Sequence, residues 1–497
     1  MCLAVLASFG ILLAPSFYAS GAELDEGTLL TYPMRVLDGA WPQRDFETFY
    51  GPGTPVMLAG AYAVLGPSVG LERTIGMGFK ILAILAIFLI VLPEGKAMAA
   101  LCALITGGIL QSDGVVANPM ANALALDLFA LALLVHARRR SSANRLSLAS
   151  GLLIGVGVLF RADFAVAAVL GALPLLRGMG GPERRRWLAG VGAGVLAFAV
   201  DIAVVGRAKD ELLLGDLLRS RAGTRVPMPL LLSANGLLMV LSGVGLLLLA
   251  TLARPAIARR APELAATGLS MALFGVALVP YFLERAGLGH IVPLSTVAIG
   301  LLPLAVIANG RVLAPTPTGW IARLLAPAAI AIGLSTAVLG GVALAHHETV
   351  ANLTGRGSIR SKDVRFGDRS FPIDARFAPE IQAILDAVPR YSRPGQRLFV
   401  GALDLRQAAY SDSFLYYLLP QLVPASYYLE LDPQSANHGT LLASELRRTD
   451  ILILTSRHDL AHPTGTFVGN TKAPEVVAKL FCVRMRRGTY VILTRCH

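Results

Sequence analysis

Long apolar runs recur along this 497-residue chain and constrain its fold more than any other feature. A run of about 18 or more apolar residues is long enough for a helix to cross a hydrocarbon core of ~30 Å. We expect about eleven such spans, near residues 3–20, 73–92, 97–112, 115–136, 146–160, 164–178, 187–206, 229–252, 263–283, 291–308 and 322–345. Only 15% of the residues are charged, against roughly 25% in soluble proteins. The sequence therefore predicts an α-helical polytopic membrane protein.

The first run has a rival interpretation as a cleaved signal peptide. It lacks a basic leading segment, but Ser20-Gly21-Ala22 has the small residues of a cleavage site. Both alternatives remain open for this segment.

Short arginine clusters between the apolar runs supply the net charge of +12. Under the expected span count the clusters fall on one side of the membrane, at 138–140, 184–186, 254–260 and 311–323. Cytoplasmic loops are enriched in Lys and Arg. We therefore expect a multi-pass protein of the cell (inner) membrane that contacts the lipid bilayer and no nucleic acid, with its first loop and C-terminal region exoplasmic or periplasmic.

From His346 onward the chain changes to short apolar strands that alternate with helices. We expect strands at 396–403, 426–431 and 450–455, and a terminal hairpin around Arg487-Gly488. This alternation predicts a small α/β sheet with parallel pairing, Rossmann-like in architecture alone. No G-x-G-x-x-G follows a strand, so no dinucleotide site is indicated. The predicted domains are a transmembrane domain over 1–346, with a first exoplasmic loop of about 21–72, and a soluble exoplasmic α/β domain over 347–497.

The four cysteines, Cys2, Cys102, Cys482 and Cys496, show neither metal-ligand spacing nor an obvious disulfide framework. If 483–484 pairs with 491–493 in the terminal hairpin, Cys482 and Cys496 do not lie opposite one another. We therefore predict free thiols.

A polar segment after the first run holds acidic side chains, aromatics and turn residues. It begins Glu23-Leu-Asp-Glu-Gly-Thr and continues Met34-Arg-Val-Leu-Asp-Gly-Ala-Trp-Pro-Gln-Arg-Asp-Phe. Asp25 and Glu26 are adjacent, and their chemistry alone favours a structural role as a helix cap and a first-turn acid.

The order of motifs around this pair resembles the first exoplasmic loop of the GT-C superfamily of membrane glycosyltransferases, which includes protein O-mannosyltransferases and lipid A aminoarabinose transferases. The acidic pair is followed by Arg44-Asp-Phe, by Tyr50-Gly-Pro-Gly-Thr-Pro, and by Gly66-Pro-Ser before Arg73. The resemblance covers roughly the first 300 residues. It implies transfer of a sugar from a polyprenyl-phosphate donor to a glycan, lipid or protein acceptor at the outer membrane face, with inversion.

The resemblance assigns the catalytic base to Asp25, with Glu26 as its neighbour. An acceptor hydroxyl must lose a proton as it attacks the anomeric carbon, which a carboxylate within hydrogen-bond reach can accept. The ordinary Asp pKa of about 3.9 is low for this task, and a like-charged neighbour and partial burial would both raise it. Asp45 is a supporting acid with three alternative roles: orienting Arg44, binding a divalent cation or contacting the sugar. The metal requirement stays undecided.

A departing lipid phosphate needs charge stabilisation, and the planar guanidinium of arginine matches its oxygens. The candidates on the expected outer side are Arg44, Arg73, Arg161, Arg285 and His290. Glu284-Arg-Ala-Gly-Leu-Gly-His290 looks like the R-x-D-x-x-H stretch of the superfamily, although Gly287 stands where an acid is expected. Interfacial anchoring is the alternative role for Arg285 and His290. Asp113 and Asp163 are further polar candidates on this side.

Two acids, Asp127 and Asp201, fall inside expected spans. An ionisable residue at membrane depth is costly and suggests function. They support the alternative of a secondary transporter or lipid flippase, although the chain shows no internal repeat or paired broken helices. Asp201 also has a structural alternative, an ion pair with Arg207. A third alternative is a non-catalytic scaffold whose exported domain binds a partner.

Overall fold

The computed structural model describes residues 17, 19–48, 50–111, 113–139, 143–205, 234–284, 288–313, 361–406, 411–427, 429, 440–457 and 471–496. These residues belong to two compact units. The helical unit contains residue 17 and the described residues of 73–204 and 226–349. The α/β unit joins residues 19–72 to the described residues of 350–497, so the first polar segment folds together with the C-terminal region.

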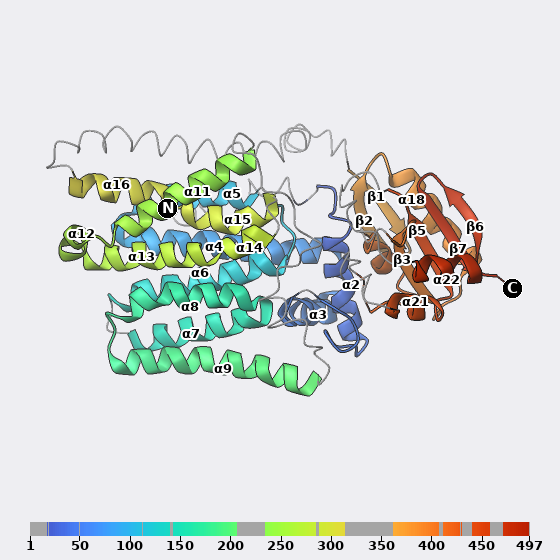
Figure 1. Cartoon of the computed structure of the whole chain (residues 1–497), viewed down its shortest axis with the longest axis horizontal. Coiled ribbons are helices and arrows are strands. Elements are labelled where there is room, and N and C mark those ends of the chain that lie inside the picture. The colour runs from blue at the N-terminus through green and yellow to red at the C-terminus, as the bar shows by residue number, and fades with distance from the viewer. Residues whose placement is uncertain are drawn as a thin grey trace. The chain divides into compact units, whose positions relative to one another are not determined.

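The helical unit is a bundle of apolar helices, shown in blue to yellow in Figure 1. Its elements are α4 (Val69–Val91, which starts in the α/β unit), η1 (Leu92–Glu94), α5 (Lys96–Gln111), α6 (Pro119–Ala137), α7 (Ala143–Phe160), α8 (Ala162–Leu176), α9 (Gly181–Val205), α11 (Ala234–Thr251), α12 (Pro255–Arg260), α13 (Pro262–Ala277), α14 (Val279–Glu284), α15 (Leu288–Ala298) and α16 (Leu302–Leu313).

Six helical stretches among the described residues are long and apolar enough to cross a membrane. They are Val69–Glu94, Pro119–Ala137, Ala143–Phe160, Gly181–Val204, Pro262–Leu283 and Gly289–Gly310. The chain is a multi-pass membrane protein, as predicted. The expected count of about eleven spans is not confirmed. The expected span at 322–345 lies outside the described residues, and of the expected span at 3–20 only residues 17, 19 and 20 are described.

Glycines let α7 and α9 approach closely. A Cβ atom at Gly151 would lie 2.1 Å from the backbone oxygen of Trp187, and one at Gly194 would lie 2.1 Å from the backbone of Gly155. Small residues are how membrane helices gain van der Waals contact when lipid removes the hydrophobic driving force. On its other face α9 exposes Leu188, Leu196 and Val204, as a lipid-facing helix would.

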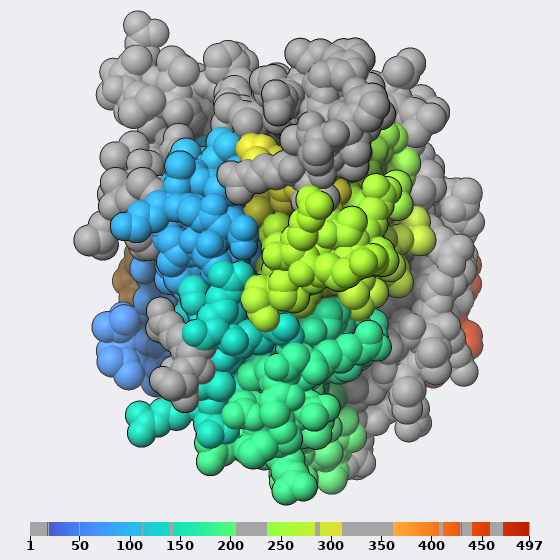
Figure 2. Space-filling model, turned by 90° about the vertical axis from the view of Figure 1, so that its left-hand side faces the viewer, coloured from blue at the N-terminus to red at the C-terminus, as the bar shows by residue number. Residues whose placement is uncertain are grey.

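Arg138 joins neighbouring helix ends at one end of the helical unit. Arg138, after α6, binds Glu263 at the start of α13 with an Nε–Oε2 distance of 2.5 Å and donates to the backbone oxygen of Leu175, near the end of α8, at 2.6 Å. Figure 2 shows this end of the unit, where the cyan, green and yellow-green helices pack against one another. The contacts therefore bring together helix ends that the charge pattern had assigned to a common side.

The α/β unit contains a five-stranded sheet in the order β4-β3-β5-β7-β6. Its strands are β3 (Arg397–Ala402), β4 (Val423–Pro424), β5 (Ile451–Thr455), β6 (Phe481–Arg487) and β7 (Tyr490–Arg495), and a separate antiparallel pair joins β1 (Ser361–Phe366) to β2 (Arg369–Asp374). β3 is parallel to β4 and β5, while β7 is antiparallel to β5 and β6. The predicted α/β sheet is present. β4 ends at Pro424, and the described residues of the strand expected at 426–431, which are 426, 427 and 429, are not in a strand; residues 428, 430 and 431 lie outside the described residues.

Helices from both ends of the sequence build the rest of this unit. They are α2 (Asp25–Leu37), α3 (Gly53–Leu65), α18 (Ala378–Tyr391), α19 (Phe414–Leu418), α21 (Leu441–Leu446) and α22 (Lys472–Leu480). Every residue of β5 is buried, as expected for the central strand of a five-stranded sheet. α2 packs against both α3 and α19, which places the polar segment within this core.

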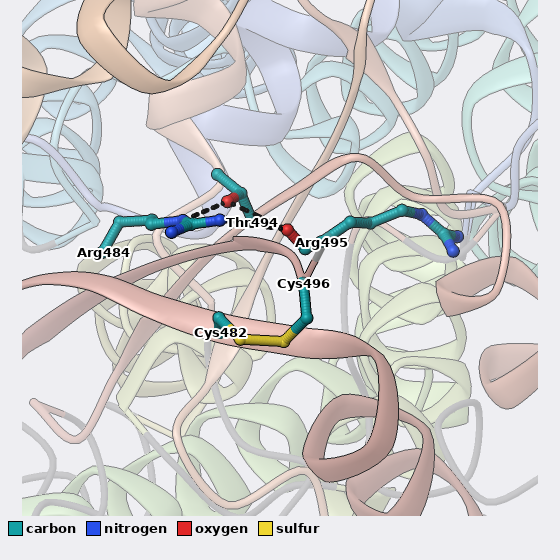
Figure 3. Close-up of a disulfide and its surroundings, with 5 residues drawn as sticks. All are labelled: Cys482, Arg484, Thr494, Arg495 and Cys496. Atoms are coloured by element: carbon teal, nitrogen blue, oxygen red, sulfur yellow. Dashed lines mark hydrogen bonds between the residues drawn. A yellow bond between two sulfur atoms is a disulfide. The ribbon is translucent and has the colours of Figure 1, made fainter.

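A disulfide joins Cys482 to Cys496, with a Cα–Cα distance of 5.1 Å (Figure 3). The prediction of free thiols is wrong for this pair. The register pairs Cys482 with Thr494, and an irregularity between Val483 and Met485 displaces the strand. Cys496 lies just past β7, where its N–H donates to the backbone oxygen of Leu480, so the two cysteines meet diagonally at the end of the hairpin. Cys102 is a buried free thiol, and Cys2 lies outside the described residues.

We expect the Cys482→Ser/Cys496→Ser variant to unfold more easily than the wild type. Closing a loop of 15 residues stabilises a protein by about 3 kcal/mol, and these cysteines are 14 positions apart in the sequence. Thermal unfolding in detergent with and without a reductant measures the effect: the reductant should lower the wild-type melting temperature to that of the variant and leave the variant unchanged. Alkylation of both cysteines in folded, unreduced wild type would contradict the pairing.

Candidate functional site

The acidic pair of the polar segment opens helix α2. Asp25 and Glu26 are its first two residues, where the helix dipole stabilises negative charge. Asp25 is exposed, whereas Glu26 is fully buried. The Thr28 hydroxyl donates to the backbone oxygen of Asp25 at 2.8 Å and ties down the first turn. The two adjacent acids therefore have different surroundings, and only Asp25 faces solvent.

The first turn of α2 lies directly on the start of α19. A Cβ atom at Gly27 would lie 2.3 Å from the backbone nitrogen of Phe414 and 2.4 Å from the Ser413 hydroxyl oxygen. The Ser413 hydroxyl is within hydrogen-bond distance of the backbone oxygens of Leu24, at 2.7 Å, and Glu23, at 3.1 Å. Backbone thus meets backbone at this contact, which only glycine permits.

The turn after α2 is fastened to the C-terminal part of the unit. The Tyr427 hydroxyl donates to the backbone oxygen of Gln43 at 2.8 Å, and the Glu47 N–H donates to the backbone oxygen of Tyr427 at 2.9 Å. Glu445 accepts from the Ser426 hydroxyl and the Tyr427 N–H, both at 2.9 Å, and burial raises the pKa of Glu445. The polar segment is therefore held at both of its ends.

Asp45 and Arg44, predicted as a catalytic acid and a phosphate ligand, bind each other. Their closest N–O distance is 2.7 Å. Asp45 also accepts from the Trp41 N–H at 2.7 Å, and its backbone oxygen accepts from Arg35 at 3.0 Å. The hydrogen bond from Arg44 lowers the pKa of Asp45, although partial burial opposes the shift. Of the three roles considered for Asp45, this geometry corresponds to orienting Arg44.

A cationic and aromatic cluster forms in the helical unit. Arg161 binds Asp163 through two hydrogen bonds of 2.9 and 2.7 Å, and its guanidinium lies 4.5 Å from the centroid of the Tyr281 ring. The His290 ring stacks on Tyr281 at 4.5 Å, and the Arg161 guanidinium also lies 5.1 Å from the Phe164 ring centroid. Arg161, Asp163 and His290 were predicted as site residues, and the structure brings them together. Tyr281 and Phe164 were missed, because an aromatic residue in an apolar run carries no distinguishing signal.

Asp113 pairs with a buried lysine that the sequence reasoning missed. The Lys80 ammonium lies 3.0 Å from Asp113 Oδ2 and 2.5 Å from the backbone oxygen of Gly114, and the Lys80 side chain is fully buried. Asp113 Oδ1 lies 3.9 Å from the Cβ position at Gly289, which places this pair next to His290. A lysine inside an expected span was the available signal, since intramembrane charge suggests function. The helical unit thus gathers Lys80, Arg161 and His290 around the start of α15.

The remaining candidates are dispersed. Arg73 donates to the backbone oxygen of Phe17 at 2.6 Å. Asp127, on α6, is fully buried, and neither of its carboxylate oxygens has a hydrogen-bond partner within the described part of the chain. Asp201 is half-buried on α9. Arg285, and the partner Arg207 suggested for Asp201, lie outside the described residues.

Metal binding has no preformed cluster in the described ranges. Nowhere in them do three or more His, Cys, Asp or Glu side chains gather in a way that could hold a metal ion.

No protein-family model and no curated protein matches the sequence. Among solved structures, the arabinofuranosyltransferase AftD from Mycobacteria superposes with a TM-score of 0.51 at 12% identity, over 99% of this chain and 40% of AftD. The chain therefore shares its fold with the arabinofuranosyltransferase AftD.

Two further solved structures are similar to this chain at lower TM-scores. ArnT from Cupriavidus metallidurans, solved bound to undecaprenyl phosphate, gives a TM-score of 0.48 at 17% identity, over 99% of this chain and 97% of ArnT. The oligosaccharyltransferase of Archaeoglobus fulgidus gives 0.46 at 12% identity, over 96% of this chain and 68% of that protein.

Proposed function

We propose that this protein is an inverting GT-C glycosyltransferase that moves a sugar from a polyprenyl-phosphate donor to an acceptor on the outer face of the inner membrane. The fold shared with the arabinofuranosyltransferase AftD over 99% of this chain carries the proposal. The two clusters of polar residues supply groups of the right chemistry, since one is cationic and the other presents an exposed carboxylate.

The cationic cluster of the helical unit is assigned to the donor phosphate. Arg161 offers a charged fork to phosphate oxygens, and the Tyr281 ring and the Asp163 carboxylate hold the guanidinium in place. Its setting among apolar helices suits a donor whose phosphate is attached to a hydrocarbon chain. Fixed positive charge at the leaving oxygen stabilises the negative charge that develops there in the transition state.

Asp25 is assigned as the general base. The acceptor hydroxyl oxygen attacks the anomeric carbon and forms the new glycosidic bond, and its proton passes to the Asp25 carboxylate. The bond from the anomeric carbon to the phosphate oxygen breaks, and the lipid phosphate leaves with the electron pair. Attack on the face opposite the leaving group inverts the anomeric configuration. Solvent exposure at the start of α2 favours Asp25 over the buried Glu26.

The Cys482–Cys496 disulfide supports an exported α/β unit. Disulfides persist in oxidising compartments and are rare in the cytosol. The positive-inside rule independently assigns the end that carries Arg138 to the cytoplasm. The disulfide is the observation that favours an α/β unit on the outer side.

A transfer assay tests the function. Membranes that contain the protein receive a synthetic polyprenyl-phosphate-linked sugar whose sugar is radiolabelled. Transfer of the label and release of the lipid phosphate report the reaction. We expect Arg161→Met to raise the KM for the donor by about 10–150-fold, which corresponds to loss of a charged hydrogen bond worth about 1.5–3 kcal/mol. Arg139→Met is the matched control. Met120, at one end of α6, contacts Tyr281 of the cationic cluster, whereas Arg139 follows the other end of α6 and pairs with Glu94. An unchanged donor KM in Arg161→Met would remove Arg161 from the donor site.

A lipid flippase is the second candidate, and the buried carboxylate of Asp127 favours it. An intramembrane acid is the kind of group that couples protons to transport. In proteoliposomes, flipping of a fluorescent lipid phosphate that depends on Asp127 and not on Asp25, without sugar transfer, would support this candidate against the enzyme.

A further inference from the structure

The sheet of the α/β unit has a ligand-binding edge by topology. From β3 the chain passes to β4 on one side and then to β5 on the other, and both are parallel to β3. In open parallel sheets, ligands bind outside the carboxyl ends of the strands where the strand order reverses in this way. In this protein that point lies at the carboxyl ends of β3 and β5.

A segment of the chain itself contacts this edge. Arg457, two residues past β5, is almost fully buried and donates to the Glu23 carboxylate in a short hydrogen bond. Its guanidinium also lies 3.5 Å from Asp412 and 4.1 Å from the centroid of the Phe377 ring. Glu23 precedes α2 by two residues, and α2 begins with Asp25. The arginine at the carboxyl end of β5 therefore holds the residue that leads into the candidate base.

The charges around Arg457 form a largely buried network. Asp412 is fully buried and accepts a short hydrogen bond from the Tyr490 hydroxyl, at the start of β7. Burial and the Asp412 carboxylate raise the pKa of Tyr490, so its hydroxyl stays protonated and donates. Burial acts to lower the pKa of Arg457, but the carboxylates of Asp412 and Glu23 outweigh it and raise that pKa overall. Arg457 is therefore a permanent cation, fixed to the sheet on one side and to Glu23 on the other.

The residues that lead into α2, Glu23 and Leu24, have a second attachment that does not involve Arg457. The Phe414 N–H donates to the backbone oxygen of Glu23 at 3.3 Å, and the Ser413 hydroxyl contacts the oxygens of Glu23 and Leu24. Because these contacts do not involve the Arg457 side chain, we expect them to keep α2 on α19 when the ion pair is lost. We therefore expect that loss of Arg457 leaves the first turn of α2 folded and changes mainly its direction.

We propose that Arg457 is a positioning residue for Asp25: the C-terminal sheet uses its ligand-binding edge to hold Glu23, and through Glu23 it sets the orientation of the carboxylate at the start of α2. This inference rests on the proposed function and gives the exported domain a part in catalysis. A displacement of about 1 Å in a catalytic group can cost about 10²-fold in rate.

Steady-state kinetics on the full-length protein test the inference. Arg457→Met and Glu23→Gln are each expected to lower kcat by roughly 10–100-fold with little change in donor KM, and Arg457→Lys should recover part of the loss. The double variant should be no worse than the more impaired single variant, because the two residues act through one interaction. Arg376→Met is the matched control, since Arg376 contacts the same Phe377 ring from an exposed position and pairs with Asp374. An unchanged kcat in Glu23→Gln overturns the inference, even if Arg457→Met fails to fold.

Hydrogen exchange separates this inference from the proposed function. Arg457→Met should speed amide exchange at residues 23–28 and leave β7 protected. If the wild type transfers no sugar, the proposed function fails whatever the exchange shows. If the wild type is active and Arg457→Met changes neither kcat nor exchange at the start of α2, only the positioning role is refuted.

Discussion

Replacing Asp25 with asparagine should lower kcat for sugar transfer by about 10²–10⁴-fold, the usual contribution of a positioned general base. Asparagine keeps the size of the side chain and removes the group that takes the proton from the acceptor hydroxyl. The donor KM should change little, because the cations assigned to the phosphate belong to the helical unit. Labelled-sugar transfer under single-turnover conditions measures the chemical step directly.

Asp38→Asn is the matched control for this substitution. Asp38 is an exposed acid at the opposite end of the same helix, so its loss should leave the rate unchanged. Persistence of transfer near the wild-type rate in Asp25→Asn would exclude Asp25 as the base. Loss of activity in Glu26→Gln, together with full activity in Asp25→Asn, would assign the role to the buried neighbour.

Gly27→Ala should destabilise the α/β unit and impair transfer together. The added methyl group would lie 2.3 Å from the Phe414 nitrogen and 2.8 Å from the Ser413 carbonyl carbon, and neither backbone atom can rotate away. Overpacking typically costs about 1–3 kcal/mol, and here it also pushes the first turn of α2 off α19. Thermal unfolding in detergent and the transfer assay should both report the change.

Gly60→Ala is the control for Gly27→Ala. A Cβ atom at Gly60, in the middle of α3, would meet no heavy atom within 4 Å. Alanine in a helix interior is about 0.5–1 kcal/mol more favourable than glycine, so this variant should be as stable as the wild type or slightly more stable. A melting temperature for Gly27→Ala equal to that of Gly60→Ala would contradict the close contact between α2 and α19.

Local patterns of the sequence were sufficient for the membrane class and for the α/β sheet. The length of an apolar run decides whether a helix can cross lipid, and short apolar strands between helices decide the type of sheet. Both properties are contained in windows of a few to twenty residues. The same windows placed Asp25 and Glu26 together, but they did not show that one is exposed and the other buried.

Pairings across hundreds of residues required the tertiary structure. Glu23 and Arg457 are 434 positions apart, and the contacts of Ser413 with Glu23 and Leu24 span 390 and 389 positions. The grouping of Arg161, Tyr281 and His290 depends likewise on how α8, α14 and α15 pack. No periodicity or spacing encodes such contacts, because they arise from the complementary surfaces of folded elements.

The two cysteines of the terminal hairpin also separate what the sequence determined from what the tertiary structure decided. The sequence by itself determined that Cys482 and Cys496 flank a hairpin. The irregularity between Val483 and Met485 decided that they form a disulfide, since one displaced residue changes which side chains meet. For this protein, local hydrophobicity determined which segments enter the membrane and which form the sheet. Long-range packing alone decided that the segment bearing Asp25 is held by the C-terminal sheet, because a buried ion pair forms only where the fold brings its partners together.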